Sequence, residues 1–256
     1  MHFKLITLNL WIGGVLFDRI VDFLREENAD IVLLQEVLQG EDPSLPIQYR
    51  SFDALRQALD YRYSDFAPSM VDIFPWGNIP NGNAVLSRLP IVQSQVTPFD
   101  PSMDSSTPRS PFDPNAWPVT PRSLQHVVVK TQAANLNIYN FQGVWDLDGD
   151  RVSPQRENMR DVILREIARK QHVIVAGDTN AKHTNPVMRA LEVPLVNVFG
   201  DELKTSFNMW RKENPGYGTA VVDMIYASRD LRVASKRCPD VDISDHLPLV
   251  AEFEIM

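Results

Sequence analysis

The segment Ile31-Val32-Leu33-Leu34-Gln35-Glu36 sets a pattern that recurs along the chain, because a short apolar run passes directly into an amide and a carboxylate. Four consecutive aliphatic residues, two of them β-branched, predict a strand that is buried on both faces. The acid that ends this strand is expected at the edge of a sheet, where it either caps a turn or takes part in chemistry.

Five further segments place an acid, amide or imidazole next to an apolar run. They are Thr7-Leu8-Asn9-Leu10-Trp11, Gly82-Asn83-Ala84-Val85, Ala176-Gly177-Asp178-Thr179-Asn180, Val222-Asp223-Met224-Ile225 and Ser244-Asp245-His246-Leu247-Pro248. Taken singly, an Asp or Asn at a strand end is most often a turn residue, and a lone histidine is most often structural. Six such places in one chain favour a shared site.

Short runs rich in Val and Ile predict many strands. The predicted strands are Phe3–Leu10, Ile31–Gln35, Ala84–Ser87, Ile91–Val96, Ser123–Thr131, Leu136–Phe141, Val173–Ala176, Val221–Ala227 and Leu249–Phe253. Helical spacing occurs at Ile20–Leu24, Phe52–Leu59 and Ser153–Ile167, the last opening with a Ser-Pro cap and first-turn pair. Many strands with few helices between them favour two packed sheets flanked by helices over a doubly wound parallel sheet.

The ordered set of motifs resembles the endonuclease/exonuclease/phosphatase superfamily, which has the DNase I-like fold. The matching motifs are Asn9 with Trp11, Leu-Gln-Glu at 34–36, Gly-Asn at 82–83, Gly-Asp-x-Asn at 177–180, Asp223 before an apolar strand and Ser-Asp-His at 244–246. The resemblance implies an α/β fold, namely a four-layered α/β sandwich with two central, largely antiparallel β-sheets flanked by helices. It also implies a single domain over residues 1–256, with a Pro-rich loop at about 97–121 on the side of the site.

The resemblance further implies phosphodiester hydrolysis that depends on a divalent metal, with Mg²⁺ as the cofactor and Mn²⁺ as a substitute. Carboxylate and amide oxygens are the ligands that such a hard cation prefers. Glu36 would be the principal metal ligand, with Asn9 and Asp245 close to it.

The remaining motif residues are expected to act on the phosphate and the attacking water. Asp178 would orient or deprotonate the water, while Asn180 and Asn83 would hydrogen-bond the phosphate. His246 would contact a phosphate oxygen or share the role of base, with Asp223 fixing its tautomer. Whether Asp178 or His246 is the base stays open at this point.

Gln142 is the main departure from the family pattern. The segment Asn140-Phe141-Gln142-Gly143-Val144-Trp145 matches a family strand that commonly ends in His. An amide donates a hydrogen bond to a phosphate oxygen but does not deliver a proton to a leaving group. Three alternatives follow: a water on the metal serves as the acid, the enzyme is slow or restricted to good leaving groups, or the residue is a substitution introduced to inactivate the protein.

The tryptophans and a few basic residues are expected to shape the substrate site. Trp11, Trp76, Trp117, Trp145 and Trp210 are predicted to line one rim suited to stacking bases, sugars or a lipid headgroup. Candidate phosphate contacts are Arg109, Arg122, Arg151, Arg156, Lys182 and Arg211, and His183 is a minor candidate for the missing acid.

Composition limits the partners without choosing the substrate. The chain has 25 Lys and Arg against 33 Asp and Glu, a net charge of −8, which disfavours a broad, sequence-independent coat on nucleic acid. The single cysteine, Cys238, excludes an intramolecular disulfide, and no signal-peptide pattern or membrane-length apolar run occurs. We therefore expect a cytoplasmic protein without a transmembrane segment, whose oligomeric state the sequence leaves open.

The favoured substrate is nucleic acid, which makes the chain a nuclease or a DNA-end-processing phosphodiesterase. The Gly-Asp-Thr-Asn motif is similar to that of the tyrosyl-DNA phosphodiesterase branch, whereas the Trp-x-Asp-Arg pattern of inositol polyphosphate phosphatases is missing around Asp223. The alternatives are a phospholipid or small-molecule phosphodiesterase of the sphingomyelinase kind and a catalytically weak binding module.

Overall fold

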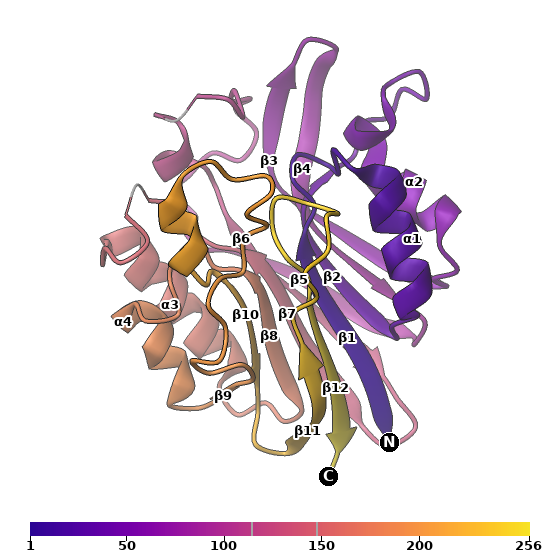
Figure 1. The fold of residues 1–256 in the computed structure, drawn as a ribbon, viewed down its shortest axis with the longest axis vertical. Helices are drawn as coiled ribbons and strands as arrows, with labels where there is room; N and C mark the ends of the chain where they lie inside the picture. Colours follow the sequence, from indigo (N-terminus) through magenta and orange to yellow (C-terminus); the bar gives the residue numbers. More distant parts are fainter. Residues whose placement is uncertain (114, 147) are drawn as a thin grey trace.

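The computed structural model describes residues 1–113, 115–146 and 148–256 and contains two six-stranded sheets packed face to face (Figure 1). The first sheet has the order β11-β12-β1-β2-β4-β3 and the second β5-β6-β7-β8-β10-β9. The first comprises β1 (His2–Asn9), β2 (Ile31–Leu38), β3 (Tyr63–Phe74), β4 (Gly77–Ser87), β11 (Leu231–Arg237) and β12 (Leu249–Ile255). The second comprises β5 (Ile91–Pro98), β6 (Ser123–Lys130), β7 (Asn135–Gln142), β8 (Val173–Asp178), β9 (Val196–Asn197) and β10 (Asp223–Ala227).

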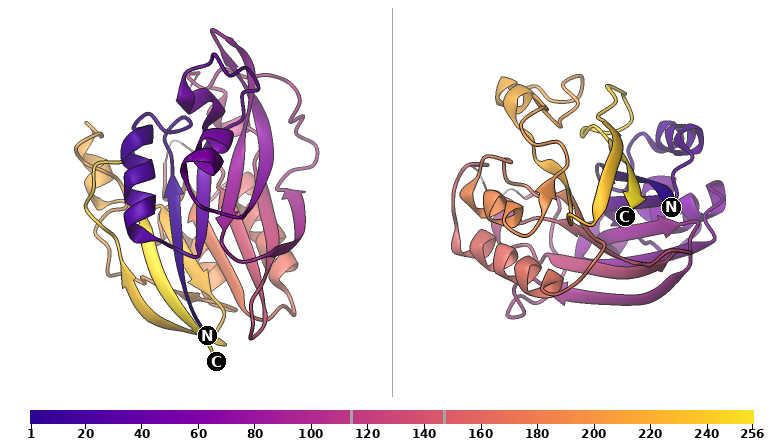
Figure 2. Two further views of the ribbon diagram at one scale, coloured as in Figure 1. Left: turned by 90° about the vertical axis from the view of Figure 1, so that its right-hand side faces the viewer. Right: turned by 90° about the horizontal axis from the view of Figure 1, so that it is seen from below.

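Helices cover the outer face of each sheet and complete four layers (Figure 2). Helices α1 (Phe17–Glu27) and α2 (Ser51–Ala58) pack on the first sheet, and α3 (Pro154–Ile167) and α4 (Pro186–Arg189) pack on the second. Short 3₁₀ turns lie at Ile47–Arg50, Trp117–Val119, Ala190–Glu192 and Pro215–Thr219. The four-layered α/β sandwich expected from the sequence is confirmed. Within the described ranges, the helices are all too short or too polar to cross a membrane.

Apolar residues drive this layering, because the central strands of each sheet are buried on both faces. One apolar cluster joins α1 and α2 to the first sheet, a second joins α3 and α4 to the other sheet, and a third lies between the sheets. Leu5 and Leu33 from the first sheet meet Ile138 and Ile174 from the second in this central cluster, and all four are fully buried. The two central strands of each sheet therefore have no solvent-facing side, which explains their continuous apolar runs.

Each sheet contains one parallel pair at its centre, and the two pairs are built alike. In the first, β1 and β2 are joined through α1, and Asn9 lies opposite Gln35. In the second, β7 and β8 are joined through α3, and Gln142 lies opposite Asp178. Because the carboxyl ends of parallel strands meet at the same sheet edge, each pair delivers its polar residues to one end of the sandwich. That end is opposite the chain termini and carries the projecting β3–β4 hairpin (Figure 1).

Asn140 joins the two sheets by hydrogen bonds in the middle of their interface. Its amide nitrogen donates to the carbonyls of Leu34 and Ala84 in the first sheet at 3.1 and 3.0 Å. Its Oδ1 accepts a bond from Gln35 Nε2 at 2.7 Å, and its nitrogen also reaches Gln125 Oε1 at 3.1 Å. These bonds fix how far one parallel pair can slide along the other.

The sequence missed or shortened several strands. β3 and β11 are edge strands with a mixture of polar residues, and β9 has only two residues, so none of them carries a clear apolar pattern. β4 begins at Gly77 rather than at Ala84, since it continues past β2 to pair with β3. Asn83 therefore lies inside a strand and not at its start, which corrects the sequence-based placement.

Replacing Asn140 by alanine is predicted to destabilise the protein by about 2–4 kcal/mol, because it removes the hydrogen bonds to the Leu34 and Ala84 carbonyls and the buried partner of Gln125 Oε1. Urea unfolding followed by circular dichroism measures the change. Asn78→Ala, an exposed position on β4, is the matched control and should be nearly neutral. Equal stability of the two variants would contradict the role given to Asn140.

Candidate active site

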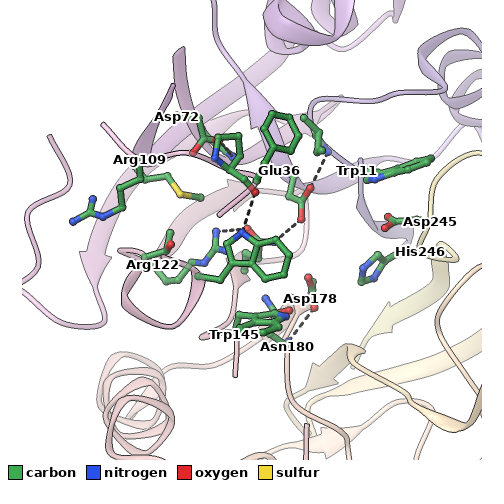
Figure 3. Close-up of a pocket in the computed structure, with 18 of the residues that line it drawn as sticks. Trp11, Glu36, Asp72, Arg109, Arg122, Trp145, Asp178, Asn180, Asp245 and His246 are labelled. Carbon is green, nitrogen blue, oxygen red and sulfur yellow. Dashed lines mark hydrogen bonds between the residues drawn. The ribbon is translucent and has the colours of Figure 1, made fainter. Parts of the chain in front are cut away.

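A cavity of about 330 Å³ opens where the carboxyl ends of the two parallel pairs meet. Figure 3 shows Glu36 near its centre, Asp72 and Arg109 to one side and Asp245 and His246 to the other. Most of the predicted motif residues lie in or directly behind this cavity, although they come from both halves of the chain.

Glu36 is turned into the cavity by a β-bulge. The pairing of β2 with β4 shifts register between Leu34 and Val37, and Glu36 has a φ of 55°. A left-handed conformation is uncommon outside glycine and marks a position that the surrounding structure over-determines. At Glu36, the left-handed backbone interrupts the alternation of side chains between the two faces of the sheet, so the carboxylate reaches the cavity. Its Oε2 accepts a bond from the Ile12 amide at 2.8 Å, and its Oε1 accepts from Asn9 Nδ2 at 3.0 Å.

Asn9 connects Glu36 with Asp178, the two principal carboxylates of the predicted site. Its Nδ2 lies 3.0 Å from Glu36 Oε1 and 3.0 Å from Asp178 Oδ2. Its Oδ1 accepts from the Trp11 amide at 2.9 Å, which fixes the orientation of the amide group. One asparagine thus bridges the first sheet and the second.

Asp178 ends β8 directly after Gly177, a position that only glycine can occupy. Gly177 has a φ of 147°, and a Cβ there would lie 1.9 Å from the Phe141 carbonyl oxygen of β7. The Asp178 Oδ1 accepts from the Asn180 amide at 2.9 Å, and Asn180 Nδ2 donates to the Gly143 carbonyl at 3.0 Å. The Gly-Asp-x-Asn motif therefore forms a fixed turn that presents both polar side chains.

His246 and Asp223 form a buried pair behind Asp178. His246 Nδ1 lies 2.8 Å from Asp223 Oδ2, and both residues are buried. Burial lowers the pKa of His246, but the charges of Asp223, Asp178 and Asp245 outweigh it and raise the pKa to about 10. His246 is therefore an imidazolium at neutral pH, which donates at both ring nitrogens.

Asp178 differs from an ordinary carboxylate. Burial raises its pKa, and the nearby charge of Asp223 acts in the same direction, while His246 and the Asn180 amide oppose the shift. A carboxylate whose pKa is raised binds a proton more readily than a surface aspartate does. This property suits a general base.

The site carries an excess of negative charge, which favours a cation. Glu36, Asp72, Asp178, Asp223 and Asp245 face Arg109, Arg122, Lys212 and His246 in and behind the cavity, so one negative charge remains when all are ionised. Ligand atoms of Asp178, Asp223 and His246 lie within 4.8 Å of one another, but Asp223 and His246 are already bonded to each other. The oxygens of Glu36 and Asp178, joined by Asn9, are the better hard-donor set.

Asp245 has a partner that the sequence did not suggest. Its Oδ2 lies 2.5 Å from the ammonium of Lys212, and the two side chains are 10% and 20% exposed. The ammonium of Lys212 therefore occupies one oxygen of the carboxylate that was predicted to bind the metal.

Gln142 occupies the centre of a buried chain of hydrogen bonds. Its Nε2 donates to Glu36 Oε1 at 2.8 Å, and its Oε1 accepts from the Arg122 guanidinium. Burial lowers the pKa of Arg122, while Glu36, Asp178 and Asp72 raise it, and a guanidinium keeps its charge in proteins. Gln142 therefore holds Arg122 and Glu36 in fixed positions.

Three of the five tryptophans that were predicted to share one rim line the cavity. Trp11, Trp117 and Trp145 line it, and the rings of Trp117 and Trp145 meet edge to face with centroids 4.9 Å apart. Trp76 and Trp210 lie outside it and are 54% and 68% exposed. Trp76 packs on Tyr49 near the tip of the β3–β4 hairpin, because the hairpin extends beyond the cavity.

Asn83 and most of the basic candidates are also set back from the cavity. Asn83 is buried, and its Nδ2 donates to the Ser123 carbonyl at 3.3 Å. Arg109 and Arg122 line the cavity. The other candidates have structural partners: Arg151, Lys182 and Arg211 pair with Asp146, Asp150 and Asp242, His183 pairs with Asp201, and buried Arg156 binds backbone carbonyls.

Sequence reasoning missed several residues that line the cavity, chiefly Asp72, Asn81 and Lys212. Asp72 and Asn81 belong to the β3–β4 hairpin, and Asn81 Nδ2 donates to Asp72 Oδ2 at 2.7 Å. Burial raises the pKa of Asp72 to about 6, against the opposing effects of Asn81 and Arg122. An acid in the middle of a strand, rather than at its end, was the only available signal.

Replacing Asp223 by asparagine is predicted to lower the pKa of His246 from about 10 toward or below its ordinary 6.5, since burial then meets less opposing charge. In the wild type, the raised pKa stabilises the fold fully below pH 6.5, and this contribution is lost as the pH rises to about 10. NMR titration of the His246 ring, with unfolding measured between those pH values, tests both effects. An unaltered His246 titration in the variant would refute this account of the pair.

Comparison with known proteins agrees with this geometry. The model of the Endonuclease/Exonuclease/phosphatase family matches residues 6–246. An endonuclease/exonuclease/phosphatase from Beutenbergia cavernae has a TM-score of 0.78 at 20% identity, covering 99% of this chain and 72% of its own. A mannosyl-6-phosphatase from Bacteroides thetaiotaomicron has a TM-score of 0.72 at 15% identity, and the match covers 99% of this chain and 100% of the phosphatase. The human Nocturnin catalytic domain with a bound sulfate anion has a TM-score of 0.68 at 19% identity, and the match covers 100% of this chain and 94% of the Nocturnin domain. No curated protein matches the chain by sequence. The match of the family model over most of the chain shows that this protein belongs to the endonuclease/exonuclease/phosphatase family.

Proposed function

We propose that the chain is a divalent-metal-dependent phosphodiester hydrolase, with nucleic acid or a processed DNA end as its substrate. Its family generally hydrolyses phosphoric esters. The observation that carries the proposal is the linked pair of Glu36 and Asp178, joined by Asn9, next to the Asp223–His246 pair in one cavity. These groups bring three carboxylates, an amide and an imidazolium close together.

Glu36 is the residue that would chiefly hold the metal, and Asp178 lies beside it, with Asn9 hydrogen-bonded to both carboxylates. A bound Mg²⁺ would neutralise charge on the phosphate oxygens and on the leaving oxygen. Asp245 offers one remaining oxygen, because the other is engaged with Lys212.

Asp178 is the proposed general base. Its raised pKa and its position beside Asn180 suit a group that takes a proton from water. His246 is already protonated at neutral pH and is therefore proposed to donate through Nε2 to a phosphate oxygen, while Asp223 holds Nδ1. We therefore assign the role of base to Asp178 rather than to His246, because an imidazolium has no free nitrogen to accept a proton.

Gln142 is proposed to position rather than to transfer protons. It holds the Arg122 guanidinium and Glu36 in one hydrogen-bonded chain, which leaves Arg122 near the place of the phosphate. Protonation of the leaving oxygen then falls to solvent, so a substrate with a good leaving group would be cleaved fastest.

The aromatic lining favours a substrate with a planar group. Trp11, Trp117, Trp145 and Phe112 line a cavity of about 330 Å³, and aromatic side chains stack on bases without regard to sequence. A small phospholipid headgroup is the second candidate, because the negative net charge of −8 disfavours an extended nucleic-acid footprint.

Hydrolysis with Mg²⁺ or Mn²⁺ should be detected on at least one of single-stranded DNA, double-stranded DNA, RNA, a phosphotyrosyl ester, sphingomyelin or bis(p-nitrophenyl) phosphate. Glu36→Gln is expected to lower turnover by about 10²–10³-fold, because the metal loses its principal carboxylate. Glu41→Gln, an exposed acid nearby, is the matched control. A nucleic-acid substrate should bind much less tightly as salt increases, whereas a headgroup should respond mildly. No turnover on any substrate would favour the weak binding module.

Replacing Gln142 by histidine is expected to preserve or raise turnover. A neutral imidazole has one donor and one acceptor nitrogen, so it can keep the contacts with Glu36 and Arg122 and adds a group able to transfer a proton. The comparison is made on the best substrate of the panel, with thermal unfolding as the check on folding. A clear loss of turnover in a folded variant would contradict the role given to Gln142.

A further inference from the structure

Lys212 is a residue of the cavity that combines a positive charge with a fixed position and that the sequence motifs did not indicate. Its ammonium lies 2.5 Å from Asp245 Oδ2, and its side chain is only 20% exposed. It also lies 5.2 Å from the ring centroids of Phe207 and Tyr217, which form an aromatic cage. Cation–π contacts of this kind hold an ammonium without using its hydrogen-bond donors.

The segment that carries Lys212 is anchored to the segment 244–246, which carries Asp245 and His246. The Asn208 amide donates to the Asp245 carbonyl at 3.0 Å, and Asn208 Nδ2 donates to the Ser244 carbonyl at 2.8 Å. The neighbouring Arg211 Nε donates to Asp242 at 2.6 Å. These contacts on both sides make Lys212 a positioned group and not a mobile surface lysine.

Lys212 has more hydrogen-bond donors than Asp245 accepts. An ammonium carries three N–H groups, and in the described part of the chain Asp245 Oδ2 is the only hydrogen-bond acceptor found for it. The remaining donors adjoin the cavity that Asp245 and His246 also line. An incoming phosphate oxygen is the acceptor that a cation in this position would take.

Lys212 also competes for the carboxylate that a second metal would need. A second divalent ion bound to Asp245 would have to displace the ammonium from Oδ2 or approach it closely, and both cost Coulomb energy in a buried site. Two-metal phosphoesterases place their ions at the two sides of the phosphate. Here one side has Glu36 and Asp178, and the other already has a cation.

We propose that Lys212 is a phosphate-binding residue that takes, at Asp245, the place of a second divalent cation. This inference rests on the proposed function for the identity of the ligand. It assigns the site one metal ion per chain and gives Lys212 a direct contact with a non-bridging oxygen of the phosphoryl group.

The test measures binding rather than hydrolysis. Calorimetry with inorganic phosphate and saturating Mg²⁺ compares the wild type with Lys212→Gln, Lys212→Arg and Lys204→Gln, the last being an exposed lysine that makes the same charge change. Lys212→Gln should weaken phosphate binding about 10- to 100-fold, the usual size of a charged hydrogen bond, while the other two variants stay within a few fold. Circular dichroism confirms that each variant is folded.

Mn²⁺ titration followed by electron paramagnetic resonance counts the metal ions. One ion should bind to the wild type and two to Lys212→Gln, because Asp245 is then free. Unchanged phosphate affinity in Lys212→Gln, no phosphate binding by the wild type, or two ions in the wild type would each overturn the proposal. A selective loss of phosphate binding without hydrolysis of any substrate would uphold the role of Lys212 and refute the proposed function.

Discussion

The packing of two parallel strand pairs against each other is the constraint on which the site depends. In each sheet a βαβ unit brings two strand ends together, and the interface between the sheets brings the two units together. Asn140 prevents sliding at that interface, because its hydrogen bonds to Leu34 and Ala84 require one alignment of the sheets. Asn9, Glu36, Gln142 and Asp178 can therefore meet within hydrogen-bond distance although they lie far apart in the sequence.

Bringing these groups together concentrates negative charge in a buried site, and several neighbouring groups stabilise that charge. Amide donors from Asn9, Gln142 and the Ile12 backbone stabilise Glu36. His246 is held as an imidazolium by the acids around it. The left-handed backbone at Glu36 and the close approach at Gly177 show that local strain is accepted in order to aim the carboxylates. The negative charge that remains favours the binding of a cation.

Much of the fold and of the site could be predicted from the sequence. Buried strands such as Ile31–Leu38 are recognisable because both faces are apolar, and motifs at their ends identify the family. The edge strand Tyr63–Phe74 was not predicted, because a strand with a solvent face and a proline lacks that signal. With it the sequence missed Asp72. Trp76 and Trp210 lie outside the cavity, because loop direction depends on contacts outside the loop.

The sequence by itself determined the chemical groups, their order and the family, since these follow from residue types next to apolar runs. Only the tertiary structure decided which groups touch. It placed Gln142 between Arg122 and Glu36, paired Asp223 with His246 and set Lys212 on Asp245. The physical reason is that proton affinity and cation binding depend on distance and burial, and both arise from packing between distant segments.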